Sequence, residues 1–265
     1  MSNTKNKSGN QLINQVSNTT TLIFIDFEAF CTTPLYPSEI GCARVQNGSI
    51  VAMLHTFMSP TNLDAIKNSK DAGQFYYTKK ITGIPAPWLP QFNKCKPCIK
   101  YEENLKQFGE LLIQFCTANS TELKNGLGKD INVQIFSEFE QNDDYVFLAK
   151  GIDLENKILS KMMGIENKVV EADDVHKKFF EEAIVFENLH SNRNFDFCDF
   201  HKKVSITNLD KIKHCALDDA VYLAKLYLHL EPTKIDAESV ETLTADVIQN
   251  GIVYKDDEIV IEFIE

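Results

Sequence analysis

Two acidic residues close the first apolar run of the chain. Asp26 and Glu28 follow Leu22-Ile23-Phe24-Ile25, which has the composition of a buried strand. Residues i and i+2 of a strand point to the same face, so the two carboxylates crowd together, which is costly unless a cation holds them. Oxygen ligands suit Mg2+ or Mn2+, and two such ions can promote phosphodiester hydrolysis. An Asp that caps a loop beside a solvated Glu is the alternative interpretation.

A second group of polar residues introduces an apolar helix near position 215. Asp219, Leu223, Leu226 and Leu230 form one stripe at helical spacing, so Asp219 is expected to face inward. His214 stands five residues earlier, where it could swing over the same site and take a proton from an attacking water. The alternatives are a surface histidine and acidic residues that merely favour the first helical turn through the helix dipole.

Cysteine and histidine also occur at metal-ligand spacing. Cys198 and His201 form a C-x2-H pair, and Cys215 follows fourteen residues after His201. Thiolate and imidazole ligands suit Zn2+, which needs a fourth ligand in a structural site. Glu39 and the Cys95-Lys96-Pro97-Cys98 pair are both candidates for that ligand. Ordinary reduced thiols are the alternative, because an odd number of cysteines, seven, argues against a disulfide framework.

The elements that must position these residues can be read from the apolar pattern. The pattern predicts an α/β fold with a mixed five-stranded sheet flanked by helices. Asn47-Gly48 predicts a hairpin between the second and third strands. Strands are expected over 22–27, 39–46, 50–58, 131–136 and 168–171, with a closing strand over 258–264. Helices are expected over 104–117, 144–162, 172–182, 215–230 and 238–249, and a long irregular insertion over 59–99.

The same pattern divides the chain into a disordered lead (1–20), one large domain (21–232) and an acidic C-terminal extension packed on it (233–265).

The net charge of −11 argues against a protein that coats nucleic acid through a basic surface. Only Arg44 and Arg193 are arginines, so phosphate contacts would fall to lysines. The sequence Phe75-Tyr76-Tyr77-Thr78-Lys79-Lys80 is the best candidate for a loop that binds a single strand of nucleic acid, because it is aromatic and basic.

The sequence has no apolar stretch as long as a membrane span, and its first residues do not form the apolar region of a signal peptide. The predicted location is therefore intracellular, cytoplasmic or nuclear, with no membrane partner.

Three segments together resemble the motifs of the DEDDh exonucleases, which have a ribonuclease-H-like fold. Ile25-Asp26-Phe27-Glu28 resembles the first motif, and His214-Cys215-Ala216-Leu217-Asp218-Asp219-Ala220 resembles the third. Asp144-Tyr145-Val146-Phe147-Leu148 fits the second motif, in which an Asp precedes an aromatic and apolar helix. Glu140 stands where that motif usually has Asn, and Asp143 is the alternative to Asp144. The resemblance implies Asp26, Glu28, Asp144 and Asp219 as metal ligands and His214 as general base.

The cysteine and histidine set adds a narrower resemblance, to the Maelstrom domain of germline small-RNA pathways. Early segments, including Pro37-Ser38-Glu39-Ile40-Gly41 and His55-Thr56-Phe57, look like the first strands of that domain. That family combines the exonuclease-like fold with a Glu-Cys-His-Cys zinc site, which would be Glu39, Cys198, His201 and Cys215 here. The resemblance covers about Thr21 to Leu230, and the gap between His201 and Cys215 is longer than expected.

The resemblances imply a 3′–5′ exonuclease that hydrolyses single-stranded RNA, or DNA, with two catalytic Mg2+ or Mn2+ ions and one structural Zn2+. The implied partners are single-stranded nucleic acid and proteins of a small-RNA silencing pathway. One alternative is a zinc-stabilised RNA-binding or scaffold domain with vestigial carboxylates. The other is an endoribonuclease whose activity does not depend on the carboxylates. His55, His176, His190 and His229 are expected to be structural or surface residues.

Overall fold

The computed structural model describes residues 20–126, 131–165, 169–171, 197–204, 214–230, 253–255 and 258–260. The chain divides into two compact units, Met1–Leu230 and Glu231–Glu265. The helices expected over 172–182 and 238–249 lie outside the described residues, as do nearly all of the expected disordered lead and most of the C-terminal extension. No helix among the described residues is long and apolar enough to span a membrane.

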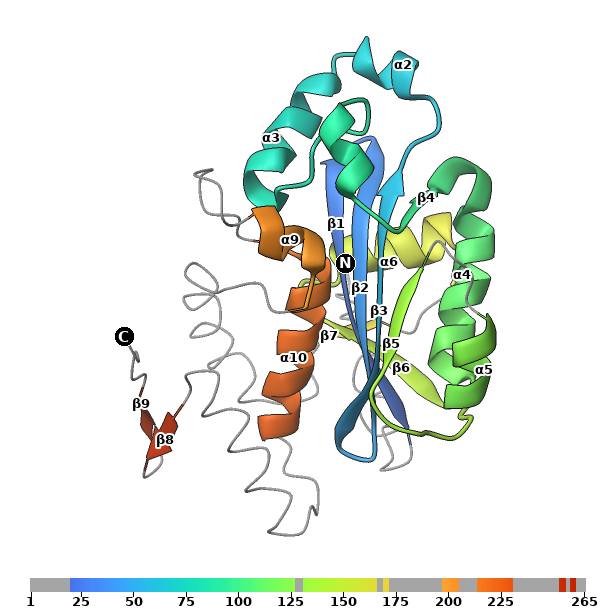
Figure 1. Cartoon of the computed structure of the whole chain (residues 1–265), viewed down its shortest axis with the longest axis vertical. Coiled ribbons are helices and arrows are strands. Elements are labelled where there is room, and N and C mark those ends of the chain that lie inside the picture. The colour runs from blue at the N-terminus through green and yellow to red at the C-terminus, as the bar shows by residue number, and fades with distance from the viewer. Residues whose placement is uncertain are drawn as a thin grey trace, which may run out of the picture. The chain divides into compact units, whose positions relative to one another are not determined.

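The first unit is built on a mixed sheet (Figure 1). Its central strand, β1, pairs antiparallel with β2 on one side and parallel with β6 on the other. The sheet order is β4-β3-β2-β1-β6-β7, and β5 also pairs with β3. The strands are β1 (Thr21–Thr32), β2 (Leu35–Gln46), β3 (Ser49–Ser59), β4 (Cys98–Lys100), β5 (Asn132–Ile135), β6 (Tyr145–Ala149) and β7 (Val169–Glu171).

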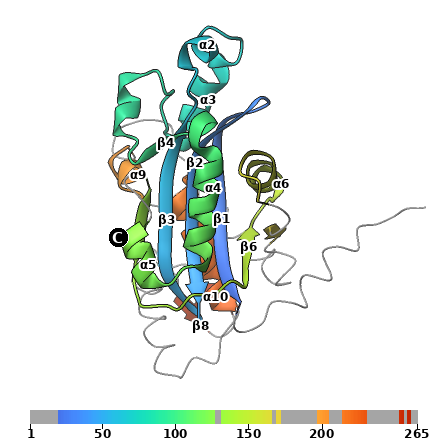
Figure 2. The ribbon, with the colours of Figure 1, turned by 90° about the vertical axis from the view of Figure 1, so that its right-hand side faces the viewer.

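Helices cover both faces of this sheet, and the two cores follow from the alternation of side chains along the strands (Figure 2). Phe24 of β1 faces the side covered by α10, whereas its neighbours Ile23 and Ile25 face the side covered by α4. The helical segments are α2 (Leu63–Lys67), α3 (Ala72–Thr82), η1 (Pro90–Lys94), α4 (Tyr101–Thr117), α5 (Ser120–Gly126), α6 (Asp153–Asn156), η2 (Lys157–Met162), α9 (Asp199–Val204) and α10 (Ala216–Leu230).

The hairpin prediction is confirmed. Asn47 and Gly48 both have positive φ, 50° and 75°, which is the backbone of a type I′ turn, and Gln46 pairs with Ser49. The helices predicted over 104–117 and 215–230 are also present as α4 and α10. The mixed α/β class is therefore correct.

The sheet is larger than predicted, with seven strands rather than five among the described residues of the first unit. The strand predicted over 131–136 is β5, which pairs antiparallel with β3. The parallel neighbour of β1 is β6, in a segment predicted to be helical (144–162). The insertion over 59–99 is also more ordered than predicted, since it contains α2, α3, η1 and the start of β4.

Within the second unit, β8 (Val253–Lys255) and β9 (Glu258–Val260) form an antiparallel pair. The closing strand predicted over 258–264 therefore begins as expected, and its remainder lies outside the described residues. Its predicted docking on the main domain stays a prediction.

Arg44 is a structural residue in the core of the first unit and does not lie at the surface. The side chain is fully buried in β2, where its Nη1 donates 2.7 Å hydrogen bonds to the carbonyls of Phe115 and Ala118 at the end of α4. Its guanidinium also lies 4.3 Å from the centre of the Phe139 ring. This arginine therefore satisfies orphan carbonyls at a helix end and does not serve as a phosphate ligand.

Candidate functional site

The first cluster of functional side chains lies on the face of β1 that α10 covers. Asp26 and Glu28 share this face with Phe24, as the strand alternation predicted. The helix approaches very closely here, since a Cβ added to Gly41, the cross-strand partner of Asp26, would lie 2.2 Å from Cα of Leu217. Glycine at position 41 thus lets the start of α10 reach the sheet beside the two carboxylates.

That close approach brings the start of α10 to Glu28. Nδ1 of His214 lies 3.9 Å from Oε1 of Glu28 and 3.8 Å from Oδ2 of Asp219. One ligand atom from each of these residues falls within 4.8 Å of the other two. The carboxylates are nearly covered, at 15% and 13% side-chain exposure, whereas His214 is half-exposed at 50%. The histidine therefore stands at the rim of the site.

Asp26 is the residue that most clearly calls for a cation. Its Oδ2 atom is inaccessible to solvent and has no hydrogen-bond partner among the described residues. Burial, followed by the negative charges of Asp219, Glu28 and Glu155, raises the pKa of its carboxyl group well above the ordinary value. A divalent ion would relieve this repulsion, so the donor set fits Mg2+ or Mn2+.

Asp144 is not brought to this cluster, which corrects the predicted ligand set. Its backbone carbonyl accepts the Thr21 amide at 2.9 Å, and its Oδ2 accepts the Thr20 hydroxyl at 2.6 Å. It therefore stands at the beginning of β1, while Asp26 lies five residues beyond Thr21, roughly 16 Å farther along the strand. The alternative, Asp143, precedes it and is exposed.

Glu155 stands near Asp26 instead. It lies in α6, the helix that follows β6, and is only 2% exposed. Its helix packs against β1, and its charge contributes to the raised pKa of Asp26. A signal for Glu155 does exist in the sequence. Ile158 and Leu159 stand three and four residues later and are buried, so the same helix face turns inward.

A second cluster joins the four predicted zinc ligands. Single ligand atoms from Glu39, Cys198, His201 and Cys215 all lie within 4.8 Å of one another, and all four residues are buried. Nδ1 of His201 is 3.0 Å from Sγ of Cys198 and 3.7 Å from Oε1 of Glu39. A tetrahedral site with bonds of 2.0–2.3 Å requires ligand separations of roughly 3.3–3.8 Å. The donor types and spacing thus fit Zn2+ with little movement.

The electrostatics of this cluster also favour a cation. Burial alone would lower the pKa of His201, but the charge of Glu39 and a hydrogen bond with Cys198 raise it to about 9. Burial would raise the pKa of the Cys198 thiol, but hydrogen bonds with Cys215, His201 and His55 lower it well below its ordinary value. The four residues therefore attract positive charge, which a metal ion would supply in place of protons.

Neighbouring groups hold the four residues in place. Nε2 of His201 is 2.6 Å from the carbonyl oxygen of Thr82, which fixes the tautomer that turns Nδ1 toward the cluster. Nε2 of His55 is 2.7 Å from Oε1 of Glu39. His55 is thus a buried structural residue, within the alternatives predicted for it, but its contact with Glu39 was not foreseen.

Asp218 also supports the zinc-type cluster, a role that the sequence did not indicate. The side chain is fully buried and accepts the backbone amides of Phe197 and Cys198, at 3.0 and 3.2 Å. Sγ of Cys215 lies 3.2 Å from its Oδ2. Asp218 therefore ties the segment that carries Cys198 to the first turn of α10.

Cys95 and Cys98, the alternative source of a fourth ligand, lie outside the four-residue cluster. Cys95 is buried near it, since burial and then the charge of Glu39 raise the pKa of its thiol. Cys98 begins β4 and is half-buried. The geometry favours Glu39, whose Oε1 also lies 3.7 Å from Sγ of Cys215.

The two clusters are adjacent. Glu28 and Glu39 are direct cross-strand partners in β1 and β2. Glu28 belongs to the first cluster and Glu39 to the second, so the clusters are neighbours on the sheet. Ala216 donates its backbone amide to Oε2 of Glu39 at 3.2 Å, and Cys215 donates its amide to Oδ2 of Asp219 at 3.2 Å. The start of α10 is therefore held by one carboxylate of each cluster.

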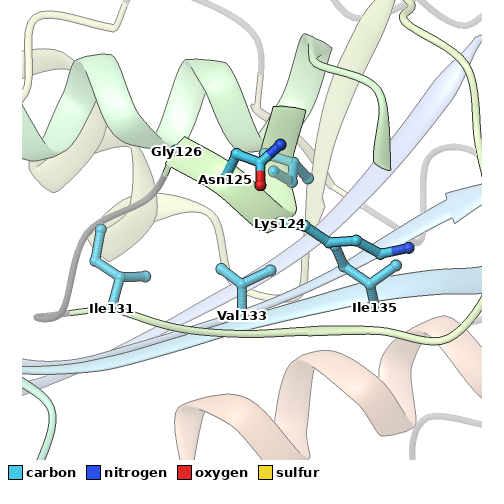
Figure 3. Close-up of a pocket in the computed structure, with 7 residues that line it drawn as sticks. Lys124, Asn125, Gly126, Ile131, Val133 and Ile135 are labelled. Carbon is cyan, nitrogen blue, oxygen red and sulfur yellow. The ribbon is translucent and has the colours of Figure 1, made fainter. Parts of the chain in front are cut away.

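A pocket also lies on the other face of the sheet, between α5 and β5 (Figure 3). Its lining includes Lys124, Asn125, Ile131, Val133 and Ile135, without any acidic residue, cysteine or histidine. This lining offers none of the chemistry of the two clusters.

Comparison with solved structures gives a distant likeness. No family model matches the chain, and no curated protein matches it. Among solved structures, the crystal structure of E. coli Exonuclease I in complex with a 5cy-dA13 oligonucleotide is similar, with 12% identity and a TM-score of 0.39. The match covers 87% of this chain and 45% of that chain, so this chain spans less than half of the other's length. A likeness this distant does not assign a family or a function to the chain. The family resemblances drawn from the motifs remain predictions.

Proposed function

We propose that the protein is a metal-dependent nuclease of the DEDDh type. The observation that carries the proposal is the inaccessible Oδ2 of Asp26, which has no hydrogen-bond partner among the described residues. Glu28, Glu155 and Asp219 surround it with like charge, and their charges raise its pKa. Such an arrangement destabilises a protein unless it serves to bind cations.

The residues divide the work of phosphodiester hydrolysis among them. Asp26, Glu28, Glu155 and Asp219 would hold two Mg2+ or Mn2+ ions, which supply Lewis acidity to the phosphate and a lowered pKa to the attacking water. His214, at the rim, accepts a proton from that water as general base. Glu28 and Asp219 lie close enough to its ring to orient it.

The proposed substrate is single-stranded RNA, with DNA as the alternative, degraded from the 3′ end. This part of the proposal rests on the resemblance to the exonuclease and Maelstrom motifs, as does a place among the proteins of small-RNA silencing. A single Zn2+ held by Glu39, Cys198, His201 and Cys215 would have a structural role, because all four ligand positions come from buried protein groups.

Digestion of 5′-end-labelled single-stranded RNA and DNA, with Mn2+ and with EDTA, tests the function. The expected result is a ladder of progressively shorter labelled products with Mn2+ and intact substrate with EDTA. Products that begin with internal cuts and persist in EDTA would support the carboxylate-independent endoribonuclease instead. Binding without any cleavage would support the RNA-binding or scaffold domain.

Glu155 and Asp144 give a sharp comparison of the two possible ligand sets. Glu155→Gln keeps the shape of a buried side chain and removes its charge, so we expect kcat to fall by at least about 100-fold, the upper range for groups that support a bound metal. Asp144→Asn should leave kcat within about twofold, because Asp144 lies at the other end of β1.

Cleavage rates at saturating Mn2+, with melting temperatures measured on the same preparations, check this comparison. A large loss in Asp144→Asn with normal activity in Glu155→Gln would restore the ligand set predicted from the motifs. It would also contradict the geometry described above.

A further inference from the structure

The exposed face of α3 carries an aromatic and basic surface beside the proposed nuclease site. Tyr76 and Tyr77 are 47% and 65% exposed, among the most exposed large apolar side chains of the described residues. The sequence suggested a loop here, but the segment is helical and Phe75 is fully buried. Exposing two adjacent tyrosines on one helix costs apolar burial, so their exposure needs an explanation.

The core holds this aromatic surface rigidly. Phe75 stacks on Phe30 of β1 with ring centres 4.8 Å apart, and Trp88 packs on Phe75 at 5.0 Å. Trp88 in turn donates its Nε1 hydrogen to the hydroxyl of Tyr76 at 3.0 Å, with the two rings edge to face. A preorganised aromatic surface of this kind loses little conformational freedom when a flat ring stacks on it.

The surface is continuous with the proposed site. The hydroxyl of Thr78 donates to the carbonyl of Phe30 at 2.9 Å, and Phe30 is two residues beyond Glu28 on β1. At the end of α3, the carbonyl of Ile81 accepts the backbone amide of His214 at 3.4 Å. Tyr77 stands one helical turn before Ile81, roughly 6 Å along the helix axis. A strand a few nucleotides long would therefore reach from the site to Tyr77.

Positive charge accompanies the tyrosines. Lys79 and Lys80 lie in the last turn of α3, between Tyr77 and the end that contacts His214. The chain as a whole carries a charge of −11, and Arg44 is buried in the core. Two lysines next to an acidic site are thus suited to contact phosphates that would otherwise be repelled.

We propose that this face of α3 is the platform that binds single-stranded nucleic acid in the proposed nuclease. Bases stack on Tyr77 and Tyr76, and Lys79 and Lys80 contact the backbone that leads to the carboxylates. The proposal rests on the proposed function for its choice of occupant. Stacking without base-specific hydrogen bonds also predicts binding with little sequence preference.

The test is fluorescence anisotropy with a labelled 12-nucleotide single strand in buffer without added Mg2+ or Mn2+, where the proposed cleavage does not occur. Tyr77→Ala should weaken binding by about 5-fold to 100-fold, the range for loss of one base-stacking aromatic. Tyr77→Trp should bind at least as tightly as the wild type, because stacking does not need the hydroxyl. Phe136→Ala is the matched control, since Phe136 is also an exposed aromatic residue, at 55%, but follows β5.

Kinetics on two substrate lengths separate the platform from the nuclease. With Mn2+, Tyr77→Ala should raise KM for the 12-mer and leave kcat unchanged, while hydrolysis of a dinucleotide, which is too short to reach Tyr77, stays normal. Unchanged affinity in Tyr77→Ala, or an equal loss in Phe136→Ala, would overturn the platform even if the wild type cleaves. If the wild type never cleaves but Tyr77→Ala still binds more weakly than the wild type, the platform is upheld and the nuclease is refuted.

Discussion

Asp26→Asn is expected to abolish cleavage and, at the same time, to stabilise the metal-free protein. Burial and four neighbouring carboxylates raise the pKa of Asp26 in the folded state. The folded protein thus binds this proton more strongly than the unfolded chain, so the metal-free protein loses stability as pH rises from the unfolded value of about 3.9 through the folded one. Asparagine removes that loss, and the melting temperature at neutral pH without added Mg2+ or Mn2+ should rise by at least about 2 °C, corresponding to about 1 kcal/mol.

Thermal unfolding with and without Mn2+ distinguishes this effect from a general stabilisation. Wild-type protein should melt at a higher temperature as Mn2+ is added, because the ion binds only the folded state, and Asp26→Asn should respond far less. Asp153→Asn is the matched control, since Asp153 is an exposed acidic residue in α6, the helix that also carries Glu155. Undiminished cleavage by Asp26→Asn would rule out the carboxylate mechanism.

The strand and helix that carry the first cluster could be predicted, but the fourth carboxylate, Glu155, was missed. Asp26 and Glu28 follow from the two-residue period of a strand, and Asp219 follows from the apolar stripe of α10. The run Tyr145–Ala149 is equally apolar on both sides, so its pattern does not separate a strand from a helix. Only its pairing with β1 makes it a strand. The helix therefore begins after this strand, as α6, which contains Glu155, and not at Asp144.

The zinc-type ligands were easier to predict than the residues around them. The C-x2-H spacing places Cys198 and His201 on one turn of chain, a local relation that sequence carries directly. His55 meets Glu39 only because β2 pairs with β3, where Glu39 is opposite Phe57 and Gly41 is opposite His55. Contacts of this second kind depend on strand register, which a single sequence does not specify strongly.

Cys198→Ser is expected to remove zinc, lower the melting temperature and slow cleavage together. Elemental analysis of the dialysed wild type should give one zinc per chain, and the variant should give none. Structural zinc contributes directly to folding free energy, and loss of a metal is among the changes that destabilise by more than ~4 kcal/mol, or roughly 8 °C or more for a domain of this size. Cys116→Ser is the matched control, because Cys116 is also buried but lies in the core on the other face of the sheet.

The expected loss of cleavage follows from the shared start of α10. Glu39 accepts the backbone amide of Ala216, and Cys215 is next in sequence to His214, so a disordered zinc-type cluster would release the general base and Asp219 together. The loss should therefore appear in kcat and should not be restored by excess Mn2+. If Glu39→Ala keeps its zinc while Cys95→Ser loses it, the fourth ligand is Cys95, and Cys215 alone links the metal to α10.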